Sequence, residues 1–285
     1  MVPITDFRAA ALSAADRMPF LPAVFHRTLA MFARKGDDVA VNEVASLIEQ
    51  DVVMAGNLIS VANSALYSRS GSVCSVRQAI ARIGVRKTRN ALLGLSVLRS
   101  FRGVKFPQGW SAARFNDHSL ATAILSDLLV QKAPAENPEW AFIAGLMHDV
   151  GLLLIATAFP EDVHMVSESE NDCQLVEYER EMLGFTHFEI GARLLSRWNC
   201  PVIVQEASLF CESNEFEYRD PAPLGMVVKT ASLLADATGL SVFGPQTQDL
   251  TFAPQLLEAL SIEKPMSFFD AFRSEYGGFQ NCATN

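Results

Sequence analysis

Residues 145–151 read Gly-Leu-Met-His-Asp-Val-Gly, a polar pair surrounded by apolar residues and bracketed by two glycines. The pair lies near the end of a predicted helix that starts at Asn137-Pro138, an Asn followed by Pro at the first helical position. At a helix end, the imidazole of His148 and the carboxylate of Asp149 can both face one divalent cation. The stretch therefore predicts either a metal site or a buried polar network, although a His-Asp pair alone is a weak signal.

Outward from this stretch, apolar residues recur at spacings of three and four along nearly the whole chain, and alternating runs are almost absent. We therefore predict an all-α protein. Helices are expected at about 22–34, 51–63, 75–84, 85–101, 111–132, 137–147 and 225–238, with Asn42 as the cap of another short one. Two more are expected to start at the capping box of Thr186 and Glu189 and at Pro201.

The composition is that of a globular protein, with 285 residues of which 49% are hydrophobic. No apolar run is long enough to span a bilayer, and the first residues lack a basic segment followed by an apolar one, so we expect a cytoplasmic protein without membrane association. The five cysteines are scattered without a CxxC pair, which predicts free thiols.

The net charge of −9 argues against nonspecific nucleic-acid binding, which needs clustered Lys and Arg. The charge is nevertheless segregated, because residues 52–116 contain no acidic residue and the rest of the chain stands at −19. Two interpretations are open: the basic segment contacts acidic parts of its own fold, or it forms a surface for an anionic ligand or an acidic partner. Its basic residues are Arg69, Arg77, Arg82, Arg86, Lys87, Arg89, Arg99, Arg102, Lys105 and Arg114.

The stretch at 145–151 closely resembles the GLLHDiG core of the HD-superfamily phosphohydrolases. Other stretches resemble landmarks of the HDOD family, the signalling branch of that superfamily. These are Leu21-Pro22-Ala23, Asn63-Ser64-Ala65-Leu66-Tyr67, Ser75–Gly84, Glu181–Ala192 and Trp198-Asn199-Cys200-Pro201. The resemblance covers about residues 19–238 and implies a two-lobed helical HDOD architecture with an HD-like C-terminal half. We expect an N-terminal lobe at 1–106, an HD-like lobe at 107–240 and a C-terminal helical extension at 241–285.

The resemblance also implies metal ligands, and these are His118, His148, Asp149 and His187. The site is incomplete, because Ser232 stands where the last ligand Asp is expected and Phe210-Cys211 replaces a frequent His-His pair. A hydroxyl lacks the negative charge that offsets the desolvation of a divalent ion. A buried hydrogen-bonded network, a metal ion bound without turnover and true hydrolysis therefore remain alternatives, and no catalytic residue is assigned.

The family resemblance implies a bacterial-type regulatory protein of signal transduction. We expect it to be noncatalytic and to bind an acidic protein partner or a phosphorylated small ligand through Arg82, Arg86, Lys87 and Arg89. The alternative is a metal-dependent phosphohydrolase acting on a nucleotide or another phosphorylated substrate, with a divalent metal ion that activates water.

Overall fold

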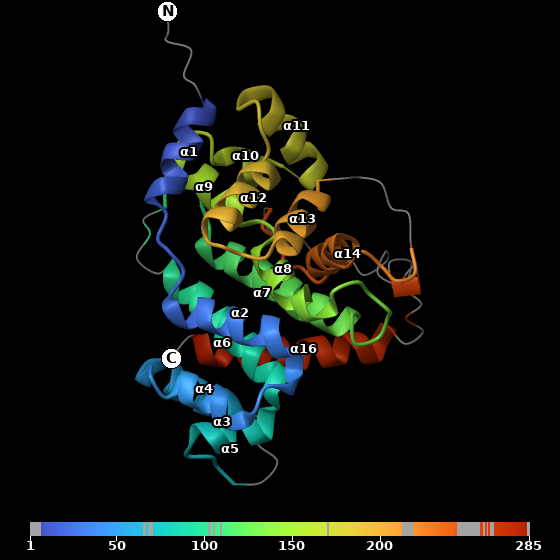
Figure 1. Ribbon diagram of the computed structural model, residues 1–285. Coiled ribbons are helices and arrows are strands. Elements are labelled where there is room, and N and C mark those ends of the chain that lie inside the picture. Colours follow the sequence, from blue (N-terminus) through green and yellow to red (C-terminus); the bar gives the residue numbers. More distant parts are fainter. Residues whose placement is uncertain are drawn as a thin grey trace, which may run out of the picture. The chain divides into compact units, whose positions relative to one another are not determined.

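The computed structural model describes residues 7–64, 67, 71–101, 104, 106–108, 110–169, 171–212, 219–243, 257–258, 260, 262 and 265–283. These residues form helices and no strand, which confirms the all-α class (Figure 1). The chain groups into two units. We call Met1–Pro19 with Val104–Pro265 the larger unit, and Phe20–Gly103 with Met266–Asn285 the smaller unit.

The smaller unit contains α2 (Ala23–Lys35), η1 (Gly36–Asp38), α3 (Val41–Ile48), α4 (Val52–Asn63), α5 (Val76–Ile83), α6 (Val85–Ser100) and α16 (Pro265–Ala283). Its helix starts follow the sequence signals. Asp51 accepts a hydrogen bond from the Met54 amide at 2.9 Å, and Ser75 accepts one from the Gln78 amide at 3.3 Å. Helix α2 packs on α3 and α6, and α5 packs on α3, α4 and α6.

The larger unit contains α1 (Phe7–Arg17), α7 (Ala112–Leu129), η2 (Pro138–Trp140), α8 (Ala141–Met147), α9 (Val150–Ala158), α10 (His164–Glu168), α11 (Asp172–Met182), α12 (His187–Arg197), α13 (Val202–Phe210) and α14 (Leu224–Ala237). Helix α8 packs against α7, α13 and α14, and α12 packs against α9 and α13. The predicted capping box at Thr186 and Glu189 is present at the start of α12.

The two glycines of the 145–151 stretch allow helices to cross closely. A Cβ atom on Gly145 would lie 2.7 Å from the Thr122 carbonyl oxygen of α7. A Cβ atom on Gly151 would lie 1.9 Å from the His187 carbonyl oxygen at the start of α12. Because no side chain fits in these gaps, the glycines bring the His-Asp pair between α7 and α12.

Two local expectations are wrong. Helix α3 begins at Val41, so Asn42 lies inside the helix and cannot cap it. Asn137 has a left-handed φ of 51° and makes no side-chain cap, and a 3-10 turn precedes α8. Within the expected C-terminal helical extension, residues 265–283 form one helix, α16, with apolar residues at spacings of three and four. Those buried on α16 are Phe268, Phe269, Phe272, Tyr276 and Phe279.

The grouping departs from the expected division at both ends of the chain. Arg197 of α12 donates hydrogen bonds to the carbonyls of Ala15 and Asp16 at the end of α1, which a helix C-terminus leaves unpaired. The first residues therefore belong with the larger unit. At the other end, α16 belongs with the smaller unit, where Glu275 pairs with Lys87 of α6. The boundaries expected at 106/107 and 240/241 stay predictions.

Among the described residues, one stretch, Pro138–Ala158, is long and apolar enough to cross a membrane by length and composition. Of its most apolar window, 89% is buried inside the protein. Such burial is typical of the core of a domain, and here the stretch is divided into η2, α8 and α9.

Candidate metal centre

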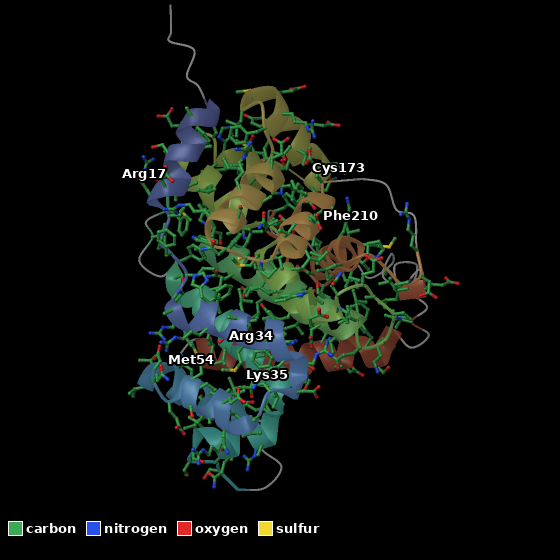
Figure 2. All side chains as sticks on the ribbon, in the orientation of Figure 1. Arg17, Arg34, Lys35, Met54, Cys173 and Phe210 are labelled. Atoms are coloured by element: carbon green, nitrogen blue, oxygen red, sulfur yellow. The ribbon has the colours of Figure 1, made fainter. Side chains whose placement is uncertain are left out.

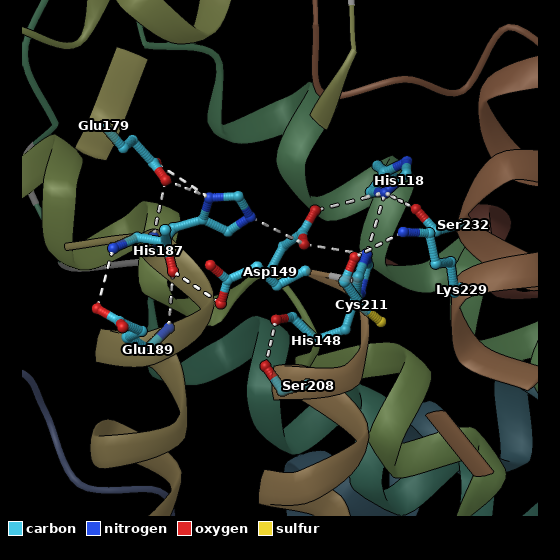
Figure 3. Close-up of polar contacts among 12 residues, drawn as sticks. His118, His148, Asp149, Glu179, His187, Glu189, Ser208, Cys211, Lys229 and Ser232 are labelled. Atoms are coloured by element: carbon cyan, nitrogen blue, oxygen red, sulfur yellow. Dashed lines mark hydrogen bonds and ion pairs between the residues drawn. The ribbon is translucent and has the colours of Figure 1, made fainter. Parts of the chain in front are cut away.

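His118 of α7, His148 at the end of α8 and Asp149 at the start of α9 meet inside the larger unit (Figure 3). Nε2 of His118 lies 3.3 Å from Nε2 of His148 and 3.5 Å from Oδ2 of Asp149. Nε2 of His148 lies 3.1 Å from Oδ1 of Asp149. All three residues are at most 2% exposed. The ligand atoms of the three residues lie within 4.8 Å of one another, close enough to share a small ligand.

The outer nitrogens of both imidazoles face backbone carbonyl oxygens. Nδ1 of His118 lies 2.8 Å from the Leu240 oxygen, and Nδ1 of His148 lies 2.9 Å from the Gly145 oxygen. Because a carbonyl oxygen can only accept, each Nδ1 carries a proton and donates it. In the neutral rings both Nε2 lone pairs therefore point inward, toward the carboxylate of Asp149.

The charges of the three groups are coupled. Burial lowers the pKa of His118, although the Asp149 carboxylate opposes this shift. Burial also disfavours the charged form of His148, but the negative charge of Asp149 raises the His148 pKa. Asp149 itself is penalised by burial, yet the imidazoles of His148, His118 and His187 hold its pKa well below the usual range. We therefore assign a neutral His118 and an ionised Asp149.

This arrangement fits a small cation. Inward-facing lone pairs and a carboxylate repel one another unless a proton or a metal ion lies between them. Among the described residues, buried Oδ1 of Asp149 makes no hydrogen bond. One ligand atom from each of the three residues lies within 4.8 Å of the others. Two imidazoles and one carboxylate are the protein ligands of many divalent iron sites, so a divalent ion fits here.

Ser232 of α14 lies beside the imidazole of His118. Its Oγ lies 3.3 Å from Nε2 of His118, and since that nitrogen carries a lone pair, the hydroxyl donates to it. One turn farther along α14, Oδ1 of Asp236 lies 3.4 Å from Nδ1 of His118. A carboxylate therefore is near the site, but on the outer face of the imidazole. Burial raises the pKa of Asp236 to about 7, so its charge at neutral pH is partial.

His187, at the start of α12, is held by Glu179 of α11. Both its Nδ1 and its backbone amide donate to the Glu179 carboxylate, at 2.8 and 2.9 Å. Burial opposes protonation of His187, but the charge of Glu179 raises its pKa to about 9. Its Nε2 lies 3.8 Å from Oδ1 of Asp149. His187 therefore faces the centre as a charged imidazolium, which has no lone pair for a metal ion.

The HDOD domain family matches residues 18–213, which is more than half of the chain. The chain belongs to the HDOD domain family. An uncharacterized protein from Treponema pallidum is 27% identical over 199 residues, covering 67% of this chain and 37% of that protein. The chain thus matches about a third of that protein's length.

Solved structures with this fold confirm the HDOD architecture. An HDOD domain protein of unknown function from Geobacter sulfurreducens has a TM-score of 0.70 and 24% identity, covering 95% of this chain and 90% of that one. A candidate phosphohydrolase from Shewanella amazonensis has a TM-score of 0.68 and 22% identity, covering 97% of both chains. A candidate signal transduction protein from Marinobacter aquaeolei has a TM-score of 0.67 and 19% identity, covering 98% and 68%. At these identities the likeness shows the fold alone.

Most of the basic residues expected to bind an anion in this HDOD protein are buried or contact other residues of the same chain. Arg89 is buried at 3% exposure, with its guanidinium 5.5 Å from the ring centroid of Phe32. Lys87 pairs with Glu275. Arg82 and Arg86 are half-buried, and Arg82 contacts the Ala62 oxygen at 3.4 Å. Anion binding by these four residues stays a prediction.

Two other cations of the acid-free segment, Arg99 and Arg102, bear on whether the segment forms a basic surface. Arg99 pairs with Asp51 at 3.1 Å, and both side chains are about a third exposed. Arg102 lies outside the described residues. Acidic residues from beyond the segment, Asp51 and Glu275, thus reach its cations because the smaller unit folds them together.

Three residues near this HDOD site were not identified from the sequence, namely Glu179, Asp236 and Lys229. The acidic residue that meets His187 is Glu179 and not Glu181, which is exposed. Glu179 lies eight residues before His187, and a turn between them hides the pairing from a periodicity argument. Asp236 could have been found from its position four residues after Ser232, on the same helix face. Lys229 is 8% exposed and donates to the Cys211 oxygen at 3.1 Å, and we find no sequence signal for its burial.

Proposed function

We propose that this HDOD protein is a noncatalytic module of bacterial-type signal transduction that works in the cytoplasm by binding a partner. The partner is an acidic protein or a phosphorylated small ligand. The proposal rests on one observation, the hydroxyl of Ser232 beside His118 at 3.3 Å, where HD enzymes are expected to have a carboxylate.

The physical reason is the charge at the centre. A divalent ion bound by His118, His148 and Asp149 would gain one anionic ligand, and Ser232 adds none. When bound, such an ion supplies Lewis-acid chemistry and a water of lowered pKa. The protonated His187 adds positive charge near Asp149 and opposes a second ion. We therefore expect weak metal binding and no turnover.

A metal-dependent phosphohydrolase is the second candidate. It is supported by the three buried groups whose ligand atoms lie within 4.8 Å of one another, and by the buried Oδ1 of Asp149 that lacks a hydrogen bond among the described residues. In that case His118, His148 and Asp149 hold the ion, and His187 donates a proton or a hydrogen bond to an anionic substrate.

Metal analysis of protein purified without added metal tests the proposal, together with assays of phosphomonoesters, phosphodiesters and nucleotides in added Mn²⁺. We expect less than one ion per chain and turnover no higher than in a His148→Ala variant. The variant is the matched control, because contaminating hydrolases act equally in both preparations. One tightly bound ion per chain, with turnover that His148→Ala abolishes, would contradict the proposal and support the phosphohydrolase.

A further inference from the structure

Helices α2 and α3 of the smaller unit border a groove of about 750 Å³. Its α2 side carries Arg27, Arg34 and Lys35, all of them exposed, and two of these are labelled in Figure 2. Its α3 side carries polar residues, among them Ser46 and Gln50. These cations precede the acid-free segment.

Contacts across the groove mark its two ends. At one end Nη1 of Arg27 donates to Oε1 of Gln50 at 2.5 Å. At the other end Nζ of Lys35 pairs with Glu43 at 2.7 Å. Glu43 is the single carboxylate among the lining residues, which carry three cations. The groove therefore has a net positive charge in a chain whose net charge is −9.

The spacing of the cations defines what they can bind. Arg27 and Arg34 are seven residues apart, so they lie two turns apart on the same face of α2, about 10 Å along the axis. Between them the lining residues include Met31 of α2 and Leu47 of α3, which are half-buried and buried. The groove thus has an apolar middle between two positive ends.

We propose that this groove binds an acidic peptide segment of a partner protein, in which two carboxylates about 10 Å apart flank an apolar side chain. In an extended peptide alternate residues share a face, so a Glu-x-Leu-x-Glu segment presents two carboxylates and an apolar side chain on one side. Its backbone spans about 13 Å at roughly 3.3 Å per residue, and rotation of the long Glu and Arg side chains covers the difference. A single phosphate group fits less well, because its oxygens need donors that converge on one point, whereas these cations are spread over two turns. The inference rests on the proposed function for the existence of a partner, and it names the surface and the chemistry.

Fluorescence anisotropy tests the inference with a labelled, end-blocked peptide that has Glu at two positions four residues apart and Leu midway between them. We expect saturable binding to the full chain that weakens as salt rises from about 0.02 to about 0.3 M, since exposed charges are screened. A peptide with Lys in place of each Glu should not bind.

The variant pair Arg27→Glu with Arg34→Glu should weaken binding at least tenfold. The matched control is Arg77→Glu with Arg273→Glu, which makes the same change of charge at exposed positions of the smaller unit that do not line the groove. The control should lose less than twofold, and circular dichroism should show both variants folded. Equal losses in the two variants would overturn the inference, because net charge alone would explain the binding.

Other outcomes overturn it in distinguishable ways. If the acidic peptide does not bind, the groove is not a peptide-binding site. The metal and hydrolysis assays decide separately whether the protein is noncatalytic. Displacement of the peptide by an equal concentration of inorganic pyrophosphate would assign the groove to a phosphorylated ligand. Self-association of the parent that disappears in the Arg27→Glu, Arg34→Glu variant would assign it to a second copy of the chain.

Discussion

Gly151→Ala tests whether the crossing of α9 and α12 holds the site together. The new Cβ atom would lie 1.9 Å from the carbonyl oxygen of His187 and 2.9 Å from the amide nitrogen of Gly191, whereas ordinary contact begins at about 3.4 Å. The two helices must therefore separate by roughly 1.5 Å, and the obstructing atoms are backbone and cannot rotate away. Overpacking usually costs about 1–3 kcal/mol, so we expect a loss of about 3 kcal/mol or more.

Urea unfolding followed by tryptophan fluorescence measures this loss, because all three tryptophans lie between Val104 and Pro265 in the larger unit. Gly56→Ala is the matched control. Gly56 is exposed in the interior of α4, and nothing lies within 4 Å of its would-be Cβ, so alanine should stabilise α4 by about 0.5–1 kcal/mol. Circular dichroism follows that variant. If Gly151→Ala is as stable as the parent, the two helices do not cross as closely as the structure shows and the reasoning fails.

Further predictions concern the same centre and the thiols. In protein treated with a chelator, Glu179→Gln should be destabilised by a few kcal/mol below pH 6.5, because Glu179 raises the pKa of His187 to about 9 and this stabilisation is present when His187 is protonated. The difference should shrink as the pH rises through 9, and a pH-independent difference in unfolding free energy would contradict it. Ser232→Asp should raise the affinity for Mn²⁺ at least tenfold in calorimetry, since it adds an anionic oxygen beside Nε2 of His118, and equal affinities would show that the pocket does not admit the ion. Iodoacetamide should label the exposed Cys74 and Cys173 in native protein but not Cys200, which is buried and whose pKa burial raises to about 12, and labelling of Cys200 before unfolding would contradict its burial.

The sequence by itself determined the helical class and most helix ends. Spacings of three and four predict helices because they form one apolar face, and short-range hydrogen bonds at Asp51, Ser75 and Thr186 are encoded within three residues. The resemblance of the 145–151 stretch also led to the correct family. A local signal failed at Asn137, whose φ is left-handed and whose side chain caps no helix.

Tertiary structure alone decided the electrostatics of the protein. Charge segregation along the chain left open whether the basic segment contacts its own fold or forms a surface, and folding brought Glu275 to Lys87 and buried Arg89 against Phe32. The same is true of the centre, where Glu179 determines the charge of His187 and α14 presents Ser232 to one nitrogen of His118 and Asp236 to the other. Helix formation depends on residues three or four apart, so it can be read from the sequence. Charge and burial depend on groups brought together from distant parts of the chain, so they cannot be known before the helices pack.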